Sequence, residues 1–168
     1  MNHTFRNTAL AAMLALAAAG ASASGTHTGG HGHDADDAIG KPGVATKSTR
    51  TINVNMADSM RFTPADISVK QGETVRFVIK NSGQIKHELV LGTEKELKEH
   101  YEIMKRNPEM EHADANMITL APGKSGEIVW QFTKAGEVDF ACLQPGHYDA
   151  GMKGAVTVFN AAGKTVSK

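Results

Sequence analysis

The chain has a single cysteine, Cys142, among its 168 residues. One cysteine excludes an intramolecular disulfide, so a folded domain must depend on its hydrophobic core. Net charge is also lacking, because 18 basic side chains are balanced by 18 acidic ones. Without a basic patch, nucleic acid is not expected as a partner. Aromatic residues make up 5% of the chain, but the 40% hydrophobic and 21% charged content is that of an ordinary globular protein.

Long hydrophobic runs are missing after the N-terminus. The apolar run of residues 8–19 is too short to span a bilayer as a permanent helix. Arg6 precedes this run, and the small residues Ala21-Ser22-Ala23 follow it. This arrangement predicts a secretory signal peptide over residues 1–23. The alternative is an N-terminal membrane anchor. We therefore expect a protein exported to the periplasm, with no membrane span after cleavage.

Residues 24–50 contain many glycines, histidines, aspartates, serines and threonines and almost no large apolar side chains. Such a segment buries too little surface to offset the entropy of ordering it, so we expect a flexible tail. His27, His31 and His33 give the tail a composition typical of metal binding, and we expect weak binding of a metal ion such as copper there. A plain soluble linker is the alternative.

The rest of the chain, residues 51–168, is expected to form one all-β domain. Apolar residues alternate in several short segments such as residues 74–81, with turn residues between them. Residues 93–107 instead show helical spacing, and Thr93 with Glu96 resembles a capping box. The pattern predicts a Greek-key β-sandwich with one short helix inserted between the middle strands.

Cys142 ends one of the predicted strands. Val138, Phe140 and Cys142 alternate to the same side, so the thiol is expected to point inward. The loop that follows is rich in glycine and proline and carries His147 and Met152. A loop held by two strand ends can bring these three side chains to one point.

A free thiol in an oxidising compartment is a liability unless it is buried, joined to another chain, bound to a metal or used as a nucleophile. Sulfur and imidazole ligands with a thioether suit copper, whereas zinc rarely takes methionine, and calcium and magnesium prefer oxygen. The loop has one histidine, so a second must come from elsewhere. His87, at the start of a predicted strand, is the candidate, with His100 and His112 as competitors.

An enzymatic role for the same loop would use Cys142, His147 and Asp149 as nucleophile, base and orienting residue. No oxyanion element or substrate pocket is recognisable in the sequence, and His87 and Met152 would have no role. We therefore do not expect an enzyme.

Residues 51–160 carry four motifs of one known family: RFTPADISVKQGETVRFVIKN, KHELVLG, APGKSGEIVWQF and GEVDFACLQPGHYDAGMKGAVTV. With these motifs the sequence resembles the cupredoxins, small blue-copper proteins such as plastocyanin, azurin and auracyanin. The resemblance implies one type 1 copper with His87, Cys142 and His147 in the equatorial plane and Met152 as the axial ligand. The C-x4-H-x4-M spacing and the histidine-rich tail are most similar to auracyanin and to periplasmic copper-tolerance cupredoxins.

One position departs from the family's pattern, and one pair of residues lies outside the main site. Glu88 stands where plastocyanin and azurin have an asparagine that ties the two ligand loops together, and an ionised carboxylate accepts hydrogen bonds but cannot donate them. Met110 and His112 lie in a polar loop and are candidates for an accessory copper site.

The resemblance implies copper cycling between Cu(II) and Cu(I), in copper tolerance, in one-electron transfer or in both. A dedicated electron carrier and a Cu(I)-oxidising enzyme are the alternatives. We expect a monomer whose redox or copper-handling partner docks near His147, on an apolar patch that includes Leu143 and Pro145.

Overall fold

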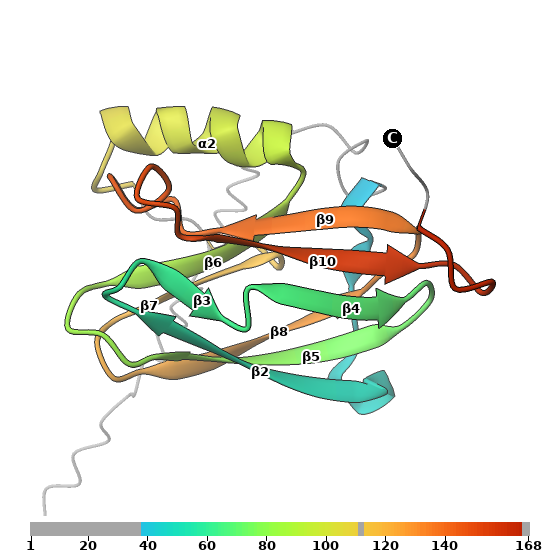
Figure 1. Cartoon of the computed structure of the whole chain (residues 1–168). Coiled ribbons are helices and arrows are strands. Elements are labelled where there is room, and N and C mark those ends of the chain that lie inside the picture. Colours follow the sequence, from blue (N-terminus) through green and yellow to red (C-terminus); the bar gives the residue numbers. More distant parts are fainter. Residues whose placement is uncertain (1–37, 111–112, 166–168) are drawn as a thin grey trace, which may run out of the picture. The chain divides into compact units, whose positions relative to one another are not determined.

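A computed structural model describes residues 38–110 and 113–165, and these residues form a β-sandwich with one α-helix (Figure 1). The predicted all-β fold with an inserted helix is confirmed. The signal peptide predicted over residues 1–23 lies outside the described residues. Within the described ranges, no helix is long and apolar enough to cross a membrane.

The sandwich consists of two five-stranded sheets. One sheet has the order β1 (Lys41–Pro42), β8 (Ser125–Gln131), β5 (Thr74–Asn81), β2 (Arg50–Ala57) and β3 (Arg61–Thr63). The other has the order β4 (Asp66–Lys70), β10 (Lys153–Phe159), β9 (Gly136–Ala141), β6 (His87–Gly92) and β7 (Met117–Leu120). The pairs β2–β5 and β4–β10 are parallel and the other pairs are antiparallel.

The core lies between the two sheets, where the longer strands contribute alternate side chains. On β5 the buried residues include Val75, Phe77 and Ile79, as the alternation in the sequence indicates. Trp130 on β8 faces the same core and is 1% exposed. The alternation therefore determines which face of each strand is turned inward.

Helix α2 (Glu94–Arg106) follows β6 and begins at the predicted capping box. The Oγ1 atom of Thr93 accepts a hydrogen bond from the backbone N–H of Glu96, whose carboxylate accepts one from the backbone N–H of Thr93. These bonds satisfy two N–H groups that have no partner within the helix. Helix α2 lies over the outer face of β6 and β9 (Figure 1). Its buried residues recur at helical spacing and pack on this face.

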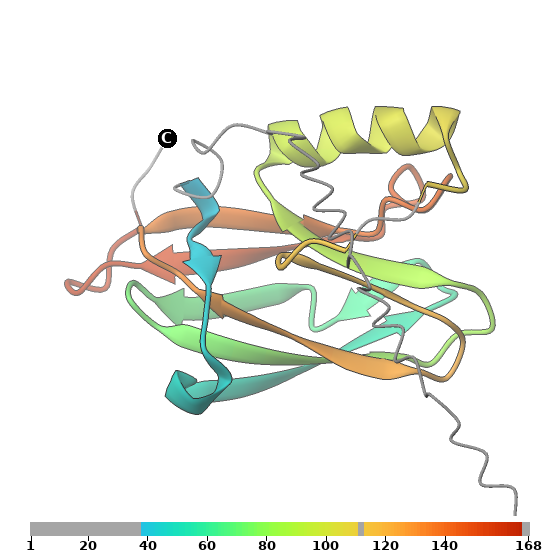
Figure 2. The same ribbon diagram turned by 180° about the vertical axis from the view of Figure 1, so that it is seen from behind.

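Residues 38–50, the last part of the predicted tail, pack against the sandwich, so the packed part of the chain begins before residue 51. The short strand β1 pairs with β8, as Figure 2 shows from behind. Ile39 is 4% exposed in the core, and its carbonyl accepts a hydrogen bond of 2.7 Å from the indole N–H of Trp130. A buried apolar side chain and pairing at a sheet edge thus attach this otherwise polar segment to the sandwich. A 3-10 turn, η1 (Ala45–Lys47), then leads into β2.

Four connections gather at one end of the sandwich, namely β2–β3, β5–β6, β7–β8 and β9–β10 (left in Figure 1). Asn81, fully buried at the end of β5, joins two of them. Its side-chain amide donates to the carbonyls of Ile85 and Leu120, and its side-chain oxygen accepts from the backbone N–H of Gly83. These bonds shape the chain that enters His87.

Candidate metal centre

His87, Cys142 and His147 meet at this end of the sandwich. The Nδ1 atom of His147 lies 3.2 Å from the Sγ atom of Cys142 and 3.2 Å from the Nδ1 atom of His87. The three ligand atoms all lie within 4.8 Å of one another, and in the described part of the chain no other histidine, cysteine or acidic residues form such a group. His100, the competitor on α2, is therefore not part of the cluster.

The cluster is closed off from water on one side. His87 and Cys142 have no exposed surface, whereas His147 is half-buried. His87 is the first residue of β6, and Cys142 directly follows β9, which pairs with β6. Two neighbouring strands of one sheet therefore hold two of the three side chains in place.

Met152 ends the loop that carries Cys142 and His147. Its carbonyl accepts a hydrogen bond of 3.0 Å from the backbone N–H of Cys142, and its own N–H donates one of 3.0 Å to the carbonyl of His147. The side chain of Met152 is fully buried in the same core cluster as Cys142. Gly146 and Gly151 have φ angles of +84° and +90°, a left-handed conformation that favours glycine, so the loop can fold back tightly.

Glu88 joins the two ligand segments as a hydrogen-bond acceptor, whereas an asparagine at this position could donate. Its carboxylate accepts hydrogen bonds from the backbone N–H of Leu143 at 2.9 Å and from the side chains of Gln144 and Thr119 at 3.2 Å each. Its backbone N–H points at the Sγ atom of Cys142 at 3.4 Å. The segment around His87 and the loop after Cys142 are therefore tied together, with the carboxylate as acceptor.

Asp58 contacts the far side of the His87 ring, a residue for which the sequence contains no signal. Its Oδ1 atom lies 2.9 Å from the Nε2 atom of His87, and its Oδ2 atom accepts a hydrogen bond of 2.7 Å from the backbone N–H of Gln84. These bonds, first that from Gln84 and then that from His87, hold the pKa of Asp58 below its usual value.

Helix α2 is bound to the ligand loop through Tyr101. The hydroxyl of Tyr101 donates to the carboxylate of Asp149 at 2.8 Å and accepts from the backbone N–H of Gly146 at 3.0 Å. Its ring lies 5.1 Å from that of Tyr148, measured between ring centroids. From the other side, Arg61 donates a hydrogen bond of 2.9 Å to the carbonyl of Ala150. Tyr101 recurs at helical spacing with the other buried residues of α2, Leu97 and Met104, but this spacing does not show what the hydroxyl binds.

Burial controls the protonation of the cluster. It raises the pKa of Cys142 from its ordinary 9.0 to about 12, and the negative charge of Glu88 adds to the rise. Burial, followed by the nearby ring of His87, lowers the pKa of His147. Without metal, the thiol is therefore protonated at neutral pH, and a metal ion must displace its proton.

These donors fit copper. Two imidazole nitrogens and one sulfur lie within 4.8 Å of one another, and the Nδ1 atom of His147 contacts both of the others. A soft thiolate with two imidazoles is a donor set that copper prefers, and calcium and magnesium do not. The burial of Met152 beside Cys142 is compatible with a weak thioether ligand.

The remaining predicted site residues lie apart from the cluster or outside the described residues. Met110, 39% exposed, follows α2, whereas His112 is not described. His27, His31 and His33 also lie outside the described residues, so extra copper in the tail stays a prediction.

The expected docking patch needs one correction, because Leu143 is fully buried. Its backbone N–H is held by Glu88, and its side chain packs in the cluster beneath α2. Pro145 is exposed as expected, and Ile85, two residues before His87, is 42% exposed. Apolar surface is therefore present beside the cluster but comes partly from a different loop.

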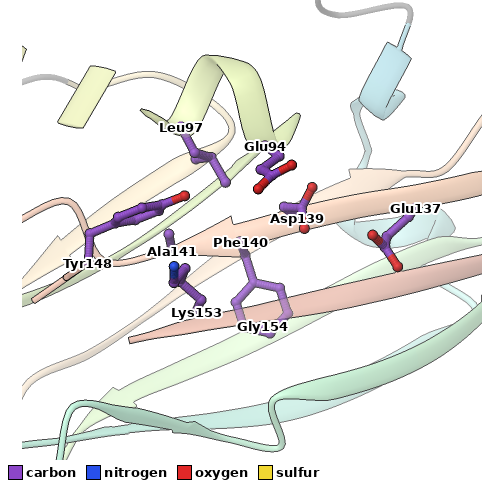
Figure 3. Close-up of a pocket in the computed structure, with 9 residues that line it drawn as sticks. All are labelled: Glu94, Leu97, Glu137, Asp139, Phe140, Ala141, Tyr148, Lys153 and Gly154. Atoms are coloured by element: carbon purple, nitrogen blue, oxygen red, sulfur yellow. The ribbon is translucent and has the colours of Figure 1, made fainter. Parts of the chain in front are cut away.

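A small pocket of about 240 Å³ lies next to the ligand loop, between α2 and the outer face of β9 and β10 (Figure 3). The ammonium group of Lys153 lies 4.2 Å from the centroid of the Tyr148 ring in this pocket. The carboxylates of Glu94, Glu137 and Asp139 also line it. They do not converge as the ligand atoms of the His87 cluster do, so the pocket adds no second metal site in the described residues.

A two-sheet sandwich with a cysteine and two histidines gathered at one end defines the class of cupredoxins. Residues 49–159 match the model of the copper binding proteins of the plastocyanin/azurin family, and the chain belongs to this family. Copper is accordingly its cofactor.

Two relatives and one solved structure add detail. The chain is 58% identical over 126 residues to the copper-resistant cuproprotein CopI of Rubrivivax gelatinosus, covering 75% of this chain and 76% of the relative. It is 39% identical over 150 residues to the copper-resistant cuproprotein CopI of Pseudomonas aeruginosa, covering 72% of this chain and 82% of that protein. Reduced auracyanin from Roseiflexus castenholzii matches with a TM-score of 0.55 and 27% identity over 66% of this chain and 98% of its own.

Proposed function

We propose that the protein is an exported copper-tolerance cupredoxin that holds one type 1 copper ion through His87, Cys142, His147 and Met152. The convergence of three ligand atoms within 4.8 Å carries the proposal. The relatives named as copper-resistant cuproproteins support the role in tolerance. The signal-peptide pattern of residues 1–23 supports a periplasmic location.

The ligand side chains differ in which oxidation state of copper they suit. The thiolate of Cys142 is soft and suits Cu(I), and the imidazoles of His87 and His147 are borderline ligands that also suit Cu(II). Held by these residues, a copper ion would supply one-electron chemistry. The bonds made by Glu88 and Tyr101 keep the ligand loop in one conformation, so the donor atoms move little when the charge of the site changes.

One-electron transfer is the second candidate role, and the half-buried ring of His147 favours it. An exposed ring edge gives an electron a short route from a docked redox protein to the cluster. Ile85 and Pro145 supply apolar surface for that partner. In either role the protein acts as a monomer that binds copper and turns over no substrate.

Titration of the mature apoprotein with Cu(II) tests the ligand assignment. We expect an intense visible thiolate-to-copper band in the wild type and its loss in Cys142→Ser. His87→Ala should weaken or shift the band, whereas His100→Ala, a matched histidine change on α2, should leave it unchanged. A band that survives in Cys142→Ser would show that the thiol is not a ligand.

Growth in copper separates the two roles. Deleting the gene should make the host strain sensitive to copper, and the wild-type protein but not Cys142→Ser should restore growth. A deletion strain that grows normally in copper, with a purified protein that shows the thiolate band, would refute tolerance and favour the dedicated electron carrier.

A further inference from the structure

We propose that Asp58 is a positioning residue that sets the His87 ring for copper and biases the site toward Cu(II). The inference rests on the proposed function, because it takes His87 as a ligand. Asp58 contacts the side of the His87 ring that is turned away from His147, and it lies 29 residues before His87 in the chain.

The hydrogen bond determines which ring nitrogen of His87 is free. A carboxylate only accepts hydrogen bonds, so the 2.9 Å contact between Oδ1 of Asp58 and Nε2 of His87 places the ring proton on Nε2. In the neutral ring, which is the form that binds a metal, the Nδ1 atom then keeps its lone pair, and this atom lies 3.2 Å from Nδ1 of His147. A carboxylate behind a histidine in this way orients the ring and raises the basicity of its other nitrogen.

The turn before β6 is built around this carboxylate. The second oxygen of Asp58 accepts the 2.7 Å hydrogen bond from the backbone N–H of Gln84. The carboxylate fits here only because residue 83 is a glycine, since a Cβ atom at Gly83 would lie 1.9 Å from Oδ1 of Asp58. The N–H of Gly83 is itself held at 2.9 Å by the side chain of Asn81. Three neighbouring residues thus keep the carboxylate against the ring.

The charge of Asp58 acts on the two oxidation states unequally. A negative charge directly behind a ligand ring stabilises the doubly charged ion more than the singly charged one. The side chain is 39% exposed, so water screens part of this effect. We expect Asp58→Asn to lower the ratio of Cu(II) to Cu(I) affinity about tenfold, the lower end for losing such a partner. For a one-electron couple, tenfold corresponds to a rise of about 59 mV in reduction potential.

Two variants separate the charge from the hydrogen bond. Asp58→Asn is nearly the same shape and keeps an oxygen that can accept from Nε2, whereas Asp58→Ala removes both properties. Glu137→Gln is the matched control, because Glu137 is an exposed carboxylate on β9 five residues before Cys142. Five strand residues correspond to about 16 Å, beyond the screening length at physiological salt.

The experiment combines nitrogen NMR of the apoprotein with potentiometry of the copper form. We expect the apo wild type and Asp58→Asn to show His87 protonated on Nε2 and Asp58→Ala to show a mixture of both ring forms. The potential should rise in Asp58→Asn and stay at the wild-type value in Glu137→Gln.

Three results would count against these ideas, each against a different part. A wild-type His87 ring protonated on Nδ1 would overturn the positioning role. An unchanged or lower potential in Asp58→Asn, with the thiolate band intact, would overturn the bias toward Cu(II). A wild type without the thiolate band would refute the proposed function, while the apoprotein spectrum would still decide how Asp58 holds the ring.

Discussion

Replacing Glu88 by alanine tests how the two ligand segments are held together. The change removes the acceptor for three donors, of which only the N–H of Leu143 is fully sealed from water. The side chain of Thr119 is exposed and can turn to solvent. Most of the loss should therefore come from one buried N–H and from the void left by the side chain.

The magnitude follows from these two effects. A hydrogen bond to a charged acceptor contributes about 1.5–3 kcal/mol net, and a small buried void costs about 1 kcal/mol more. We expect Glu88→Ala to lower the free energy of unfolding of the apoprotein by about 3 kcal/mol, or the melting temperature by about 10 °C for a domain of this size. Glu88→Gln keeps an oxygen for Leu143 and should lose about 1 kcal/mol.

Urea unfolding followed by the fluorescence of Trp130, the single tryptophan and 1% exposed, measures these losses. Metal-free protein is needed, because copper binding adds its own stability. Glu137→Ala is the control, because Glu137 is an exposed residue of β9, and it should change the stability by less than about 0.5 kcal/mol. If Glu88→Ala is no less stable than this control, the carboxylate does not hold the loop.

Three further predictions concern the surroundings of the cluster. Tyr101→Phe removes both hydrogen bonds of the hydroxyl to the loop. The free energy of unfolding should fall by about 1–2 kcal/mol, and amide exchange at Gly146 should become faster. Unchanged exchange would show that α2 does not restrain the loop. Gly83→Ala should displace Asp58 and weaken Cu(II) binding about tenfold in a chelator competition, and wild-type affinity would contradict the close contact. In the folded apoprotein, Cys142 should resist a disulfide reagent at pH 8, because it has no exposed surface and its pKa of about 12 lowers the thiolate fraction about a thousandfold. Labelling as fast as in urea-unfolded protein would refute this.

Much of the architecture is local and was predictable from the sequence. The alternation in residues 74–81 indicates a strand with one inward face, and Thr93 with Glu96 indicates where α2 begins. The position of Cys142 at the end of an alternating strand predicts a buried thiol. Such features depend on residues within a few positions of each other, so their order along the chain is sufficient.

The tail shows where composition misleads. Residues 38–50 are polar on average, but a single side chain, Ile39, finds a place in the core, and β8 has a free edge for β1. The sequence of residues 38–50 shows neither the space in the core that Ile39 fills nor the edge of β8 with which β1 pairs.

The sequence by itself determined the chemistry of the ligand loop, because the soft donors Cys142, His147 and Met152 lie within one short segment. The tertiary structure decided what surrounds them. Strand pairing brings His87 to the thiol, a turn places Asp58 behind its ring, and a helix face brings Tyr101 to the loop. These contacts join residues that are distant in the chain, and their geometry depends on how the two sheets and the helix pack together.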